Sequence, residues 1–470
     1  MNLLAALDDK NLFKPWIKRP ETWAAWRAFI AALYGLPMDD AAEAIYRRHT
    51  ARAGALPTVA SKEAWLCMGR RAGKSQVLAL IAAHLATFHD YRPYLSPGER
   101  ATIAILASDR KQARSIFRYL RALLTDVPIL RPLVERETAD SFDLANRVTI
   151  EVGVASYKST RGYTYAAVLC DEIAFWASDG AAEPDFAVLD AIRPGMSTIP
   201  TSMLLCASSP YARSGALFAA HKRYWGQDGA PLVWCADTAT MNPTVSRSII
   251  EGAFERDPLS AASEYGRDGF VTFRSDVAAF LERDAIEACI APGVRERPPV
   301  AGVAYYGFTD PSGGSKDATT LAIAHEENDR VILDAVRIVK PPFSPAETTK
   351  AFAGTLHDYR CSTVTGDRYG GEFPRELFRE FGITYRVADK NRSELYREML
   401  GPLNSGQLEL LDNPQLVNEL AALERRVARS GRETVDHPPH ASAHDDLANS
   451  VAGALYEARA RRSTYTLAGW

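Results

Sequence analysis

The stretch WLCMGRRAGKSQVLALIAAHL, from Trp65 to Leu85, indicates how the first part of this chain folds. The apolar run at 65–68 is typical of a buried strand, and the apolar spacing after Ser75 is typical of an amphipathic helix. Between them, Gly73, Lys74 and Ser75 stand in the order that ends a phosphate-binding loop. Such a loop offers backbone N–H groups and a lysine to phosphates, and a hydroxyl to Mg²⁺. The alternative for these residues is an ordinary helix start.

Apolar strands and amphipathic helices alternate through the first half of the chain. The expected strands are 64–68, 102–107, 148–154, 166–170 and 203–207, and the leading helices are 75–88 and 110–124. This alternation predicts a mainly parallel α/β sheet, whose functional loops lie at the carboxyl ends of the strands.

A second α/β pattern follows a segment rich in proline and charge, APGVRERPPVAG at 291–302. Its expected strands are 304–309, 320–325, 330–338 and 362–366, and its last long helix is 445–461. We therefore predict two α/β domains joined by a linker. The expected bounds are 1–290 for the first domain, with a helical lid region at about 211–280, 291–302 for the linker and 303–470 for the second domain.

The composition favours a soluble globular protein. The chain has 470 residues, a net charge of −3 and six scattered cysteines, so no overall field attracts it to nucleic acid or membrane. Cysteines within apolar runs indicate reduced thiols in a cytoplasm. No signal peptide is visible, and the longest apolar runs are far too short to cross a bilayer.

A pair of acidic residues ends the strand in AAVLCDEIAFW, at 166–176. Asp171 is expected to hold Mg²⁺ together with Ser75, and Glu172 to orient or deprotonate the water that attacks ATP. The alternative is a strand that ends in a solvated acidic turn. Another buried strand ends in Ser-Ser at 208–209, where hydroxyls could sense the γ-phosphate, although a plain strand-to-loop junction explains them as well.

Three acidic segments in the second half favour a metal-dependent reaction. Asp310 and Asp367 each end a strand, and Asp445 and Asp446 open the last long helix. Three converging carboxylates can hold two divalent cations about 4 Å apart, which suits phosphodiester hydrolysis. Oxygen ligands favour Mg²⁺ or Mn²⁺. Each aspartate also suits a turn or a helix N-terminus; we expect Asp446 rather than Asp445 to bind metal directly, with Asp317 as a possible outer ligand.

These motifs, in this order, resemble the large terminase subunits of tailed bacteriophages, ATPase–nucleases that package DNA into procapsids. MGRRAGKS, at 68–75, is similar to the family's variant phosphate-binding loop, with Gly69 as its small residue and Arg70 as its loop arginine. The Asp-Glu pair resembles the family's Walker B motif, and the Ser-Ser-Pro that follows resembles its coupling motif. The resemblance assigns ATP binding to Gly69, Arg70, Arg71, Ala72, Gly73, Lys74 and Ser75.

The segment STRGYTYAAVLCDE, at 159–172, resembles the arginine-glycine segment that precedes the family's Walker B motif. Arg161 thereby becomes a candidate finger that acts on the nucleotide of a neighbouring subunit; a surface arginine in a turn is the alternative. In the second domain the resemblance implies an RNase H-like nuclease with Asp310, Asp367 and Asp445 or Asp446 as metal ligands.

A basic stripe predicts where DNA could lie. Its members, spaced along one helix face, are Lys111, Arg114, Arg118 and Arg121. The segments 423–432 and 457–463 are also basic and flank the acidic segments, so phosphate contacts are expected there. A solvated helix face is the alternative for the stripe.

The resemblance implies a P-loop ATPase domain followed by an RNase H-like nuclease domain. It implies ATP with Mg²⁺ at the first site and two Mg²⁺ or Mn²⁺ at the second. The implied partners are double-stranded DNA, a portal protein, a small terminase subunit and further copies of the chain in a ring, in the host cytoplasm and without a membrane. The alternatives are a helicase-like ATPase–nuclease of DNA repair and a non-catalytic scaffold gated by nucleotide.

Overall fold

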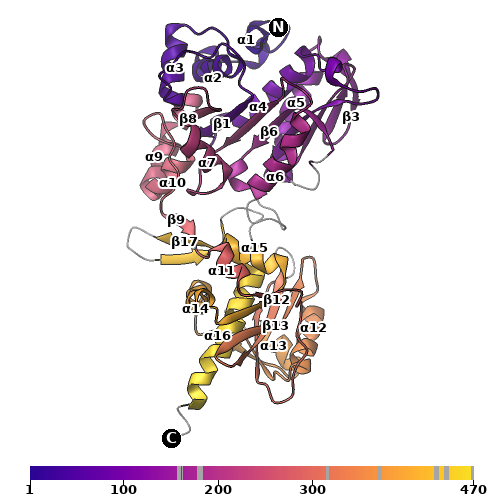
Figure 1. Cartoon of the computed structure of the whole chain (residues 1–470), viewed down its shortest axis with the longest axis vertical. Helices are drawn as coiled ribbons and strands as arrows, with labels where there is room; N and C mark the ends of the chain where they lie inside the picture. Colours follow the sequence, from indigo (N-terminus) through magenta and orange to yellow (C-terminus); the bar gives the residue numbers. More distant parts are fainter. Residues whose placement is uncertain are drawn as a thin grey trace. The chain divides into compact units, whose positions relative to one another are not determined.

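The computed structural model describes residues 1–155, 160, 162–176, 184–313, 317–367, 373–427, 433–438 and 444–466. They form two compact units, the first ending at Ser275 and the second beginning at Asp276 (Figure 1). The predicted boundary near 290 and the predicted linker 291–302 therefore lie inside the second unit. The reason is local pairing, since strand β10 (Ile290–Ala291) joins a sheet of the second unit and Arg297 N donates to Asp334 O at 2.8 Å.

The first unit contains an eight-stranded sheet in the order β3-β4-β5-β2-β6-β7-β1-β8. All of its strands from β5 to β8 in that order run parallel, and β3 and β4 add an antiparallel edge. The strands are β1 (Glu63–Met68), β2 (Ala101–Ala107), β3 (Val134–Glu137), β4 (Ser141–Leu144), β5 (Val148–Val154), β6 (Thr164–Asp171), β7 (Met203–Ser208) and β8 (Leu232–Ala236). The predicted mainly parallel α/β fold is confirmed.

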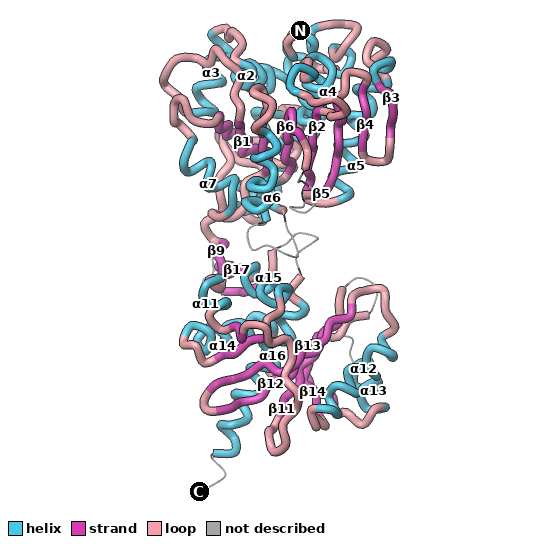
Figure 2. The backbone as a smooth tube through the Cα atoms, turned by 45° about the vertical axis from the view of Figure 1, so that its right-hand side comes forward, coloured by secondary structure: helices cyan, strands magenta, loops and turns pink. Residues whose placement is uncertain are grey.

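Helices cover both faces of this sheet (Figure 2). Successive strand residues alternate between two buried clusters, as Leu66 and Cys67 do, because side chains of a strand point to opposite faces in turn. The helices are α1 (Leu3–Asp8), α2 (Ala24–Tyr34), α3 (Asp40–Thr50), α4 (Lys74–Phe88), α5 (Arg110–Thr125), α6 (Pro184–Ile192), α7 (Gly215–Tyr224), α8 (Thr238–Met241), α9 (Arg247–Arg256) and α10 (Pro258–Glu264). The region predicted as a helical lid, 211–280, contains four of these helices, but it also supplies β8 to the central sheet.

The second unit contains a seven-stranded sheet in the order β10-β16-β13-β12-β11-β14-β15. Its remaining strands are β11 (Tyr305–Asp310), β12 (Thr319–Glu327), β13 (Arg330–Val339), β14 (Thr363–Gly366), β15 (Thr384–Val387) and β16 (Leu408–Leu411). A separate three-stranded sheet comprises β9 (Val277–Ala279), β17 (Glu424–Val427) and β18 (Glu433–Asp436). Strand β12 runs antiparallel to both of its neighbours, whereas β11, β14 and β15 run parallel.

Helices also cover the two faces of the seven-stranded sheet. They are α11 (Arg283–Glu287), α12 (Pro345–Asp358), α13 (Phe373–Glu380), α14 (Arg392–Asn404), α15 (Pro414–Ala422) and α16 (Asp446–Thr466). One buried cluster joins α16 to Phe308 of β11, and another joins α12 to Leu321 of β12. This packing brings the start of α16 to the strand ends that carry the predicted metal ligands. No helix among the described residues combines the length and the apolar character needed to cross a membrane.

Candidate nucleotide and metal sites

The loop between β1 and α4 leaves the start of α4 open to an anion. Gly73 has a φ of 99°, in the left-handed region that glycine adopts without the strain of a side chain. It occupies the N-cap position, and no side chain caps the helix there. The first N–H groups of a helix have no acceptor within the helix, so those of Lys74 and Ser75 can bind phosphate oxygens.

Met68 stands where a glycine is usual because it is the last buried residue of β1, paired with Ala236 of β8. The close backbone approach comes one residue later. A Cβ added to Gly69 would lie 2.7 Å from the carbonyl oxygen of Tyr265, so a small residue is needed at this position.

The rest of the loop is held from outside by other elements. Arg70 forms an ion pair of 3.2 Å with Glu264 at the end of α10. The carbonyl of Arg71 accepts from Asn242 Nδ2 at 2.8 Å, and that of Ala72 accepts from Trp26 Nε1 at 3.0 Å. Trp26, which sequence reasoning considered for base stacking, is thus a buried residue that supports the loop.

Lys74 lies buried at the centre of the first site. Its Nζ is 3.2 Å from a carboxylate oxygen of Glu172 and donates to Ser209 Oγ at 3.0 Å. It also donates to the carbonyls of Met68 and Gly69 at 3.3 and 3.2 Å. The phosphate-binding lysine and the acidic pair therefore meet, as the sequence predicted, at the carboxyl edge of the sheet.

Asp171 and Ser75 form the part of this site that could hold a metal ion. Ser75 Oγ donates to Asp171 Oδ2 at 2.7 Å, and Asp171 Oδ1 is buried without a hydrogen-bond partner. Burial, followed by the negative charge of Glu172, raises the pKa of Asp171 to about 6. A buried carboxylate oxygen without a partner, beside a serine hydroxyl, is a donor set that fits Mg²⁺.

Glu172 connects the acidic pair to the end of β7. It has a φ of 51°, which turns the chain directly after β6. Its Oε2 accepts from Ser208 Oγ at 3.0 Å and from Ser209 N at 3.2 Å. The serines that the sequence placed at this edge thus contact the predicted catalytic carboxylate.

Arg161, the candidate finger, lies outside the described residues. The sequence analysis missed Gln112 of α5, whose Nε2 donates to Ser75 Oγ at 3.0 Å and to Asp171 Oδ2 at 2.6 Å. A glutamine in the first turn of an amphipathic helix carries no signal of its own, because only the packing of α5 against the sheet brings it to these residues.

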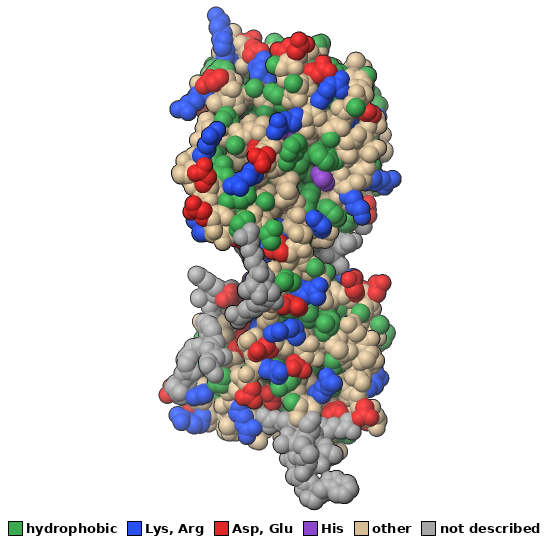
Figure 3. Space-filling model, turned by 90° about the vertical axis from the view of Figure 1, so that its left-hand side faces the viewer, with side chains coloured by type: hydrophobic (Ala, Val, Ile, Leu, Met, Phe, Trp, Pro, Cys, Tyr) green, Lys and Arg blue, Asp and Glu red, His purple; other side chains and the backbone are tan. Residues whose placement is uncertain are grey.

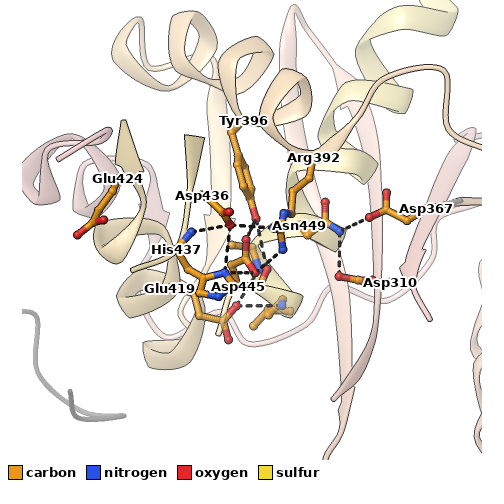
Figure 4. Close-up of polar contacts among 12 residues, drawn as sticks. Asp310, Asp367, Arg392, Tyr396, Glu419, Glu424, Asp436, His437, Asp445 and Asn449 are labelled. Atoms are coloured by element: carbon orange, nitrogen blue, oxygen red, sulfur yellow. Dashed lines mark hydrogen bonds and ion pairs between the residues drawn. The ribbon is translucent and has the colours of Figure 1, made fainter. Parts of the chain in front are cut away.

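The second site joins Asp310 and Asp367 through an asparagine (Figure 4). Asn449 Nδ2, on α16, donates to Asp310 Oδ2 at 2.9 Å and to Asp367 Oδ2 at 3.0 Å. Burial raises the pKa of both aspartates, and the asparagine hydrogen bonds oppose that rise. Asn449 Oδ1 is buried without a partner. Sequence analysis missed Asn449, although its position one helical turn after Asp446 was a usable signal.

Asp445 is enclosed by donors on the other side of α16 (Figure 4). Its carboxylate accepts from Arg392 at 2.9 Å, from Tyr396 at 2.8 Å and from His437 at 2.9 Å. Asp445 itself is almost fully buried. Because these donors occupy its oxygens, its position favours a role in anchoring the start of α16 over direct metal binding.

Asp446 faces a different group of residues. Burial raises its pKa, the charges of Asp445 and Asp317 raise it further, and His444 lowers it. The charge of Asp446 also raises the pKa of Asp310, so the two carboxylates share one region.

Among the described residues, the His, Asp and Glu side chains whose ligand atoms all lie within 4.8 Å of one another are Asp436, His437 and Asp445. This set does not contain the predicted trio. Arg392 also bonds both aspartates of the set, so its charges already balance without a metal ion.

Glu419 of α15 holds the start of α16 in place. One of its carboxylate oxygens accepts from the backbone N–H groups of Leu447 and Ala448, both at 2.9 Å. Burial raises the pKa of Glu419 to about 7, and its hydrogen bonds oppose that rise. The helix that carries Asp446 and Asn449 is thus capped by a carboxylate from another helix.

The predicted basic stripe on α5 is exposed. Its members are Lys111, Arg114, Arg118 and Arg121, and Arg121 forms an ion pair of 2.8 Å with Glu137. Figure 3 shows basic and acidic side chains interspersed over the face that it presents, in keeping with the small net charge. Any contact with DNA must therefore come from local groups.

Comparison with known proteins finds similarity only at the level of structure. No protein-family model matches the sequence, and no curated protein matches it. The similar solved structures are large terminases of bacteriophages. The large terminase of bacteriophage HK97 is 17% identical, with a TM-score of 0.38, and the match covers 92% of this chain and 99% of that one.

Two further large terminases show the same pattern. The large terminase of a thermophilic bacteriophage is 13% identical, with a TM-score of 0.35 over 83% of this chain and 93% of that one. The large terminase nuclease of the thermophilic phage G20c with bound magnesium is 16% identical, with a TM-score of 0.33 over 38% of this chain and 99% of that one. Because these scores are below 0.5, the functional argument rests on the geometry of the two sites.

Proposed function

We propose that this chain is a large terminase subunit, which hydrolyses ATP to move double-stranded viral DNA into procapsids and cuts concatemeric DNA with a metal-dependent nuclease. The observation that carries the proposal is the presence of two separate acidic centres in one chain. In the first, Lys74, Ser75 and Asp171 meet at an open helix N-terminus, and in the second, Asp310 and Asp367 meet beside α16.

In the ATPase centre, the backbone from Gly69 to Gly73 and the side chain of Lys74 bind the phosphates. Ser75 and Asp171 hold Mg²⁺, which neutralises charge that develops on the phosphates. Glu172 orients or deprotonates the attacking water, and its ion pair with Lys74 favours the carboxylate form that this role needs. The contacts of Glu172 with Ser208 and Ser209 support a role for these serines in transmitting loss of the γ-phosphate.

In the nuclease centre, Asp310, Asp367 and Asp446 hold two Mg²⁺ or Mn²⁺ ions, which supply an activated water and stabilise the leaving oxygen. Asn449 fixes the separation of Asp310 and Asp367. Asp445 is kept as an alternative ligand only if its contacts with Arg392 and His437 break.

The remaining assignments follow from the resemblance. Arg161 acts on the nucleotide of a neighbouring subunit in a ring on the procapsid, and a mixture of Arg161→Ala and Lys74→Ala chains regains some hydrolysis at mixed interfaces. A portal protein and a small terminase subunit are the further partners, in the host cytoplasm.

A packaging reaction tests the proposal. Purified procapsids, portal, small subunit, DNA and ATP are mixed with the chain, and DNA protected from added DNase is measured. We expect protection with the unaltered chain and none with Glu172→Gln. Strand separation without protection would instead support a helicase-like ATPase–nuclease.

A further inference from the structure

Gln112 belongs to neither the phosphate-binding loop nor the acidic strand, yet it bridges both proposed magnesium ligands. Its Nε2 donates to Asp171 Oδ2 at 2.6 Å and to Ser75 Oγ at 3.0 Å. Both hydrogens of one amide group are thereby directed at the pair. Ser75 and Asp171 are also joined directly by the 2.7 Å hydrogen bond.

This three-way contact decides which oxygens remain for a cation. Asp171 Oδ2 receives hydrogens from both the hydroxyl and the amide, whereas Asp171 Oδ1 is buried and has no partner. Ser75 Oγ gives its hydrogen to Asp171 and accepts one from Gln112, which leaves one of its two lone pairs. One carboxylate oxygen and one hydroxyl lone pair are therefore free.

The helix that carries Gln112 is itself fixed at this point. Asp109 is the N-cap of α5, and its carboxylate accepts from the backbone N–H groups of Lys111 and Gln112 at 2.7 and 2.9 Å. Ala113 and Ile116 of the same helix are buried in the core of the first unit. An amide on such an anchored turn can set the orientation of its partners rather than follow them.

We propose that Gln112 is a positioning residue for the nucleotide-bound metal ion. It holds the Asp171 carboxylate and the Ser75 hydroxyl in the orientation that presents Asp171 Oδ1 and one lone pair of Ser75 Oγ to Mg²⁺. The inference rests on the proposed nucleotide site and adds to it a residue from a third element, α5.

The test measures metal binding rather than turnover. Mn²⁺ is titrated into the full chain with saturating ADP, and free Mn²⁺ is followed by electron paramagnetic resonance. Gln112→Met keeps the length of the side chain but removes both donors. Loss of a group that orients metal ligands typically weakens metal binding about 10–100-fold, so we expect a shift of that size. ADP affinity in excess EDTA should stay unchanged, because Gln112 acts through the metal ligands.

Ser115→Ala is the matched control. Ser115 lies on the same helix, and its hydroxyl donates to the carbonyl of Lys111, one turn earlier. Its Mn²⁺ affinity should equal that of the unaltered chain. In a double-variant cycle, Gln112→Met should add little to Ser75→Ala, since both changes disrupt one pair of ligands.

Unaltered Mn²⁺ affinity in a folded Gln112→Met protein would overturn the inference. An equal loss of ADP affinity in EDTA would also overturn it, because the residue would then support the nucleotide pocket as a whole. If the unaltered chain bound no Mn²⁺ with ADP, the proposed nucleotide site itself would fail, which is a distinguishable result.

Discussion

Ser75 Oγ lies 2.7 Å from Asp171 Oδ2, although 96 positions of sequence separate the two residues. The parallel sheet produces this contact, because β7 lies between β1 and β6 and all three strands end at the same edge. The proposed magnesium site is therefore a consequence of strand order. Each half of it occurs where one strand gives way to the next element.

The first prediction concerns ATP hydrolysis. Lys74→Ala should weaken nucleotide binding, because it removes the charge that Lys74 brings to the phosphates. Glu172→Gln should retain ATP but hydrolyse it about 10²–10⁴-fold more slowly, since the amide cannot accept a proton from water. Phosphate release and equilibrium nucleotide binding measure the two effects. Normal turnover by Glu172→Gln would show that Glu172 has been assigned the wrong role.

The second prediction concerns DNA cleavage. Asp310→Ala, Asp367→Ala and Asp446→Ala should each abolish Mg²⁺- or Mn²⁺-dependent nicking of plasmid DNA, because each change removes a metal ligand. Asn449→Ala should reduce nicking strongly, because it frees the two aspartates that its amide holds. All four variants should hydrolyse ATP at nearly the normal rate.

Asp445 provides the internal comparison for that series. Asp445→Asn should lower the thermal stability of the protein, since it weakens contacts with Arg392 and His437, and it should impair cutting less than Asp446→Asn does. The reverse order of cutting would make Asp445 the direct ligand. Metal-dependent cutting that survives Asp310→Ala would refute the nuclease centre.

A third prediction concerns the cap of α16. Glu419→Ala leaves the N–H groups of Leu447 and Ala448 without their acceptor and should lower stability by about 1–2 kcal/mol. Glu419→Gln, which keeps an acceptor oxygen, should cost less. Calorimetry of the full chain measures both. If the two variants were equally stable, the capping role would be wrong.

A fourth prediction is a pH dependence of stability from His437. Hydrogen bonds to Asp436 and Asp445 raise the pKa of His437 to about 9, against about 6.5 in an unfolded chain. A raised folded pKa stabilises the protein fully below about pH 6.5, and this contribution is lost as the pH rises through about 9. The difference in thermal midpoint between the unaltered chain and His437→Gln should therefore shrink from about pH 6 to about pH 9.5. An unchanged difference would argue against a charged His437.

Much of the fold follows from sequence patterns, as β5 shows, whose predicted range 148–154 agrees with the structure. The boundary near 290 was wrong because a proline-rich composition does not reveal the pairing of β10 or the hydrogen bonds of Arg297. Lys74, Asp171 and Glu172 could be found because local motifs mark them. Gln112, Asn449 and Glu419 could not, since their contacts exist only after helices pack against strands.

The most direct test of two catalytic centres in one chain is a single reaction that follows phosphate release and plasmid nicking together. We predict that Glu172→Gln abolishes rapid phosphate release but still nicks DNA, and that Asp310→Asn stops nicking but still releases phosphate at nearly the normal rate. Loss of both activities in either folded variant, or retention of both, would contradict the account.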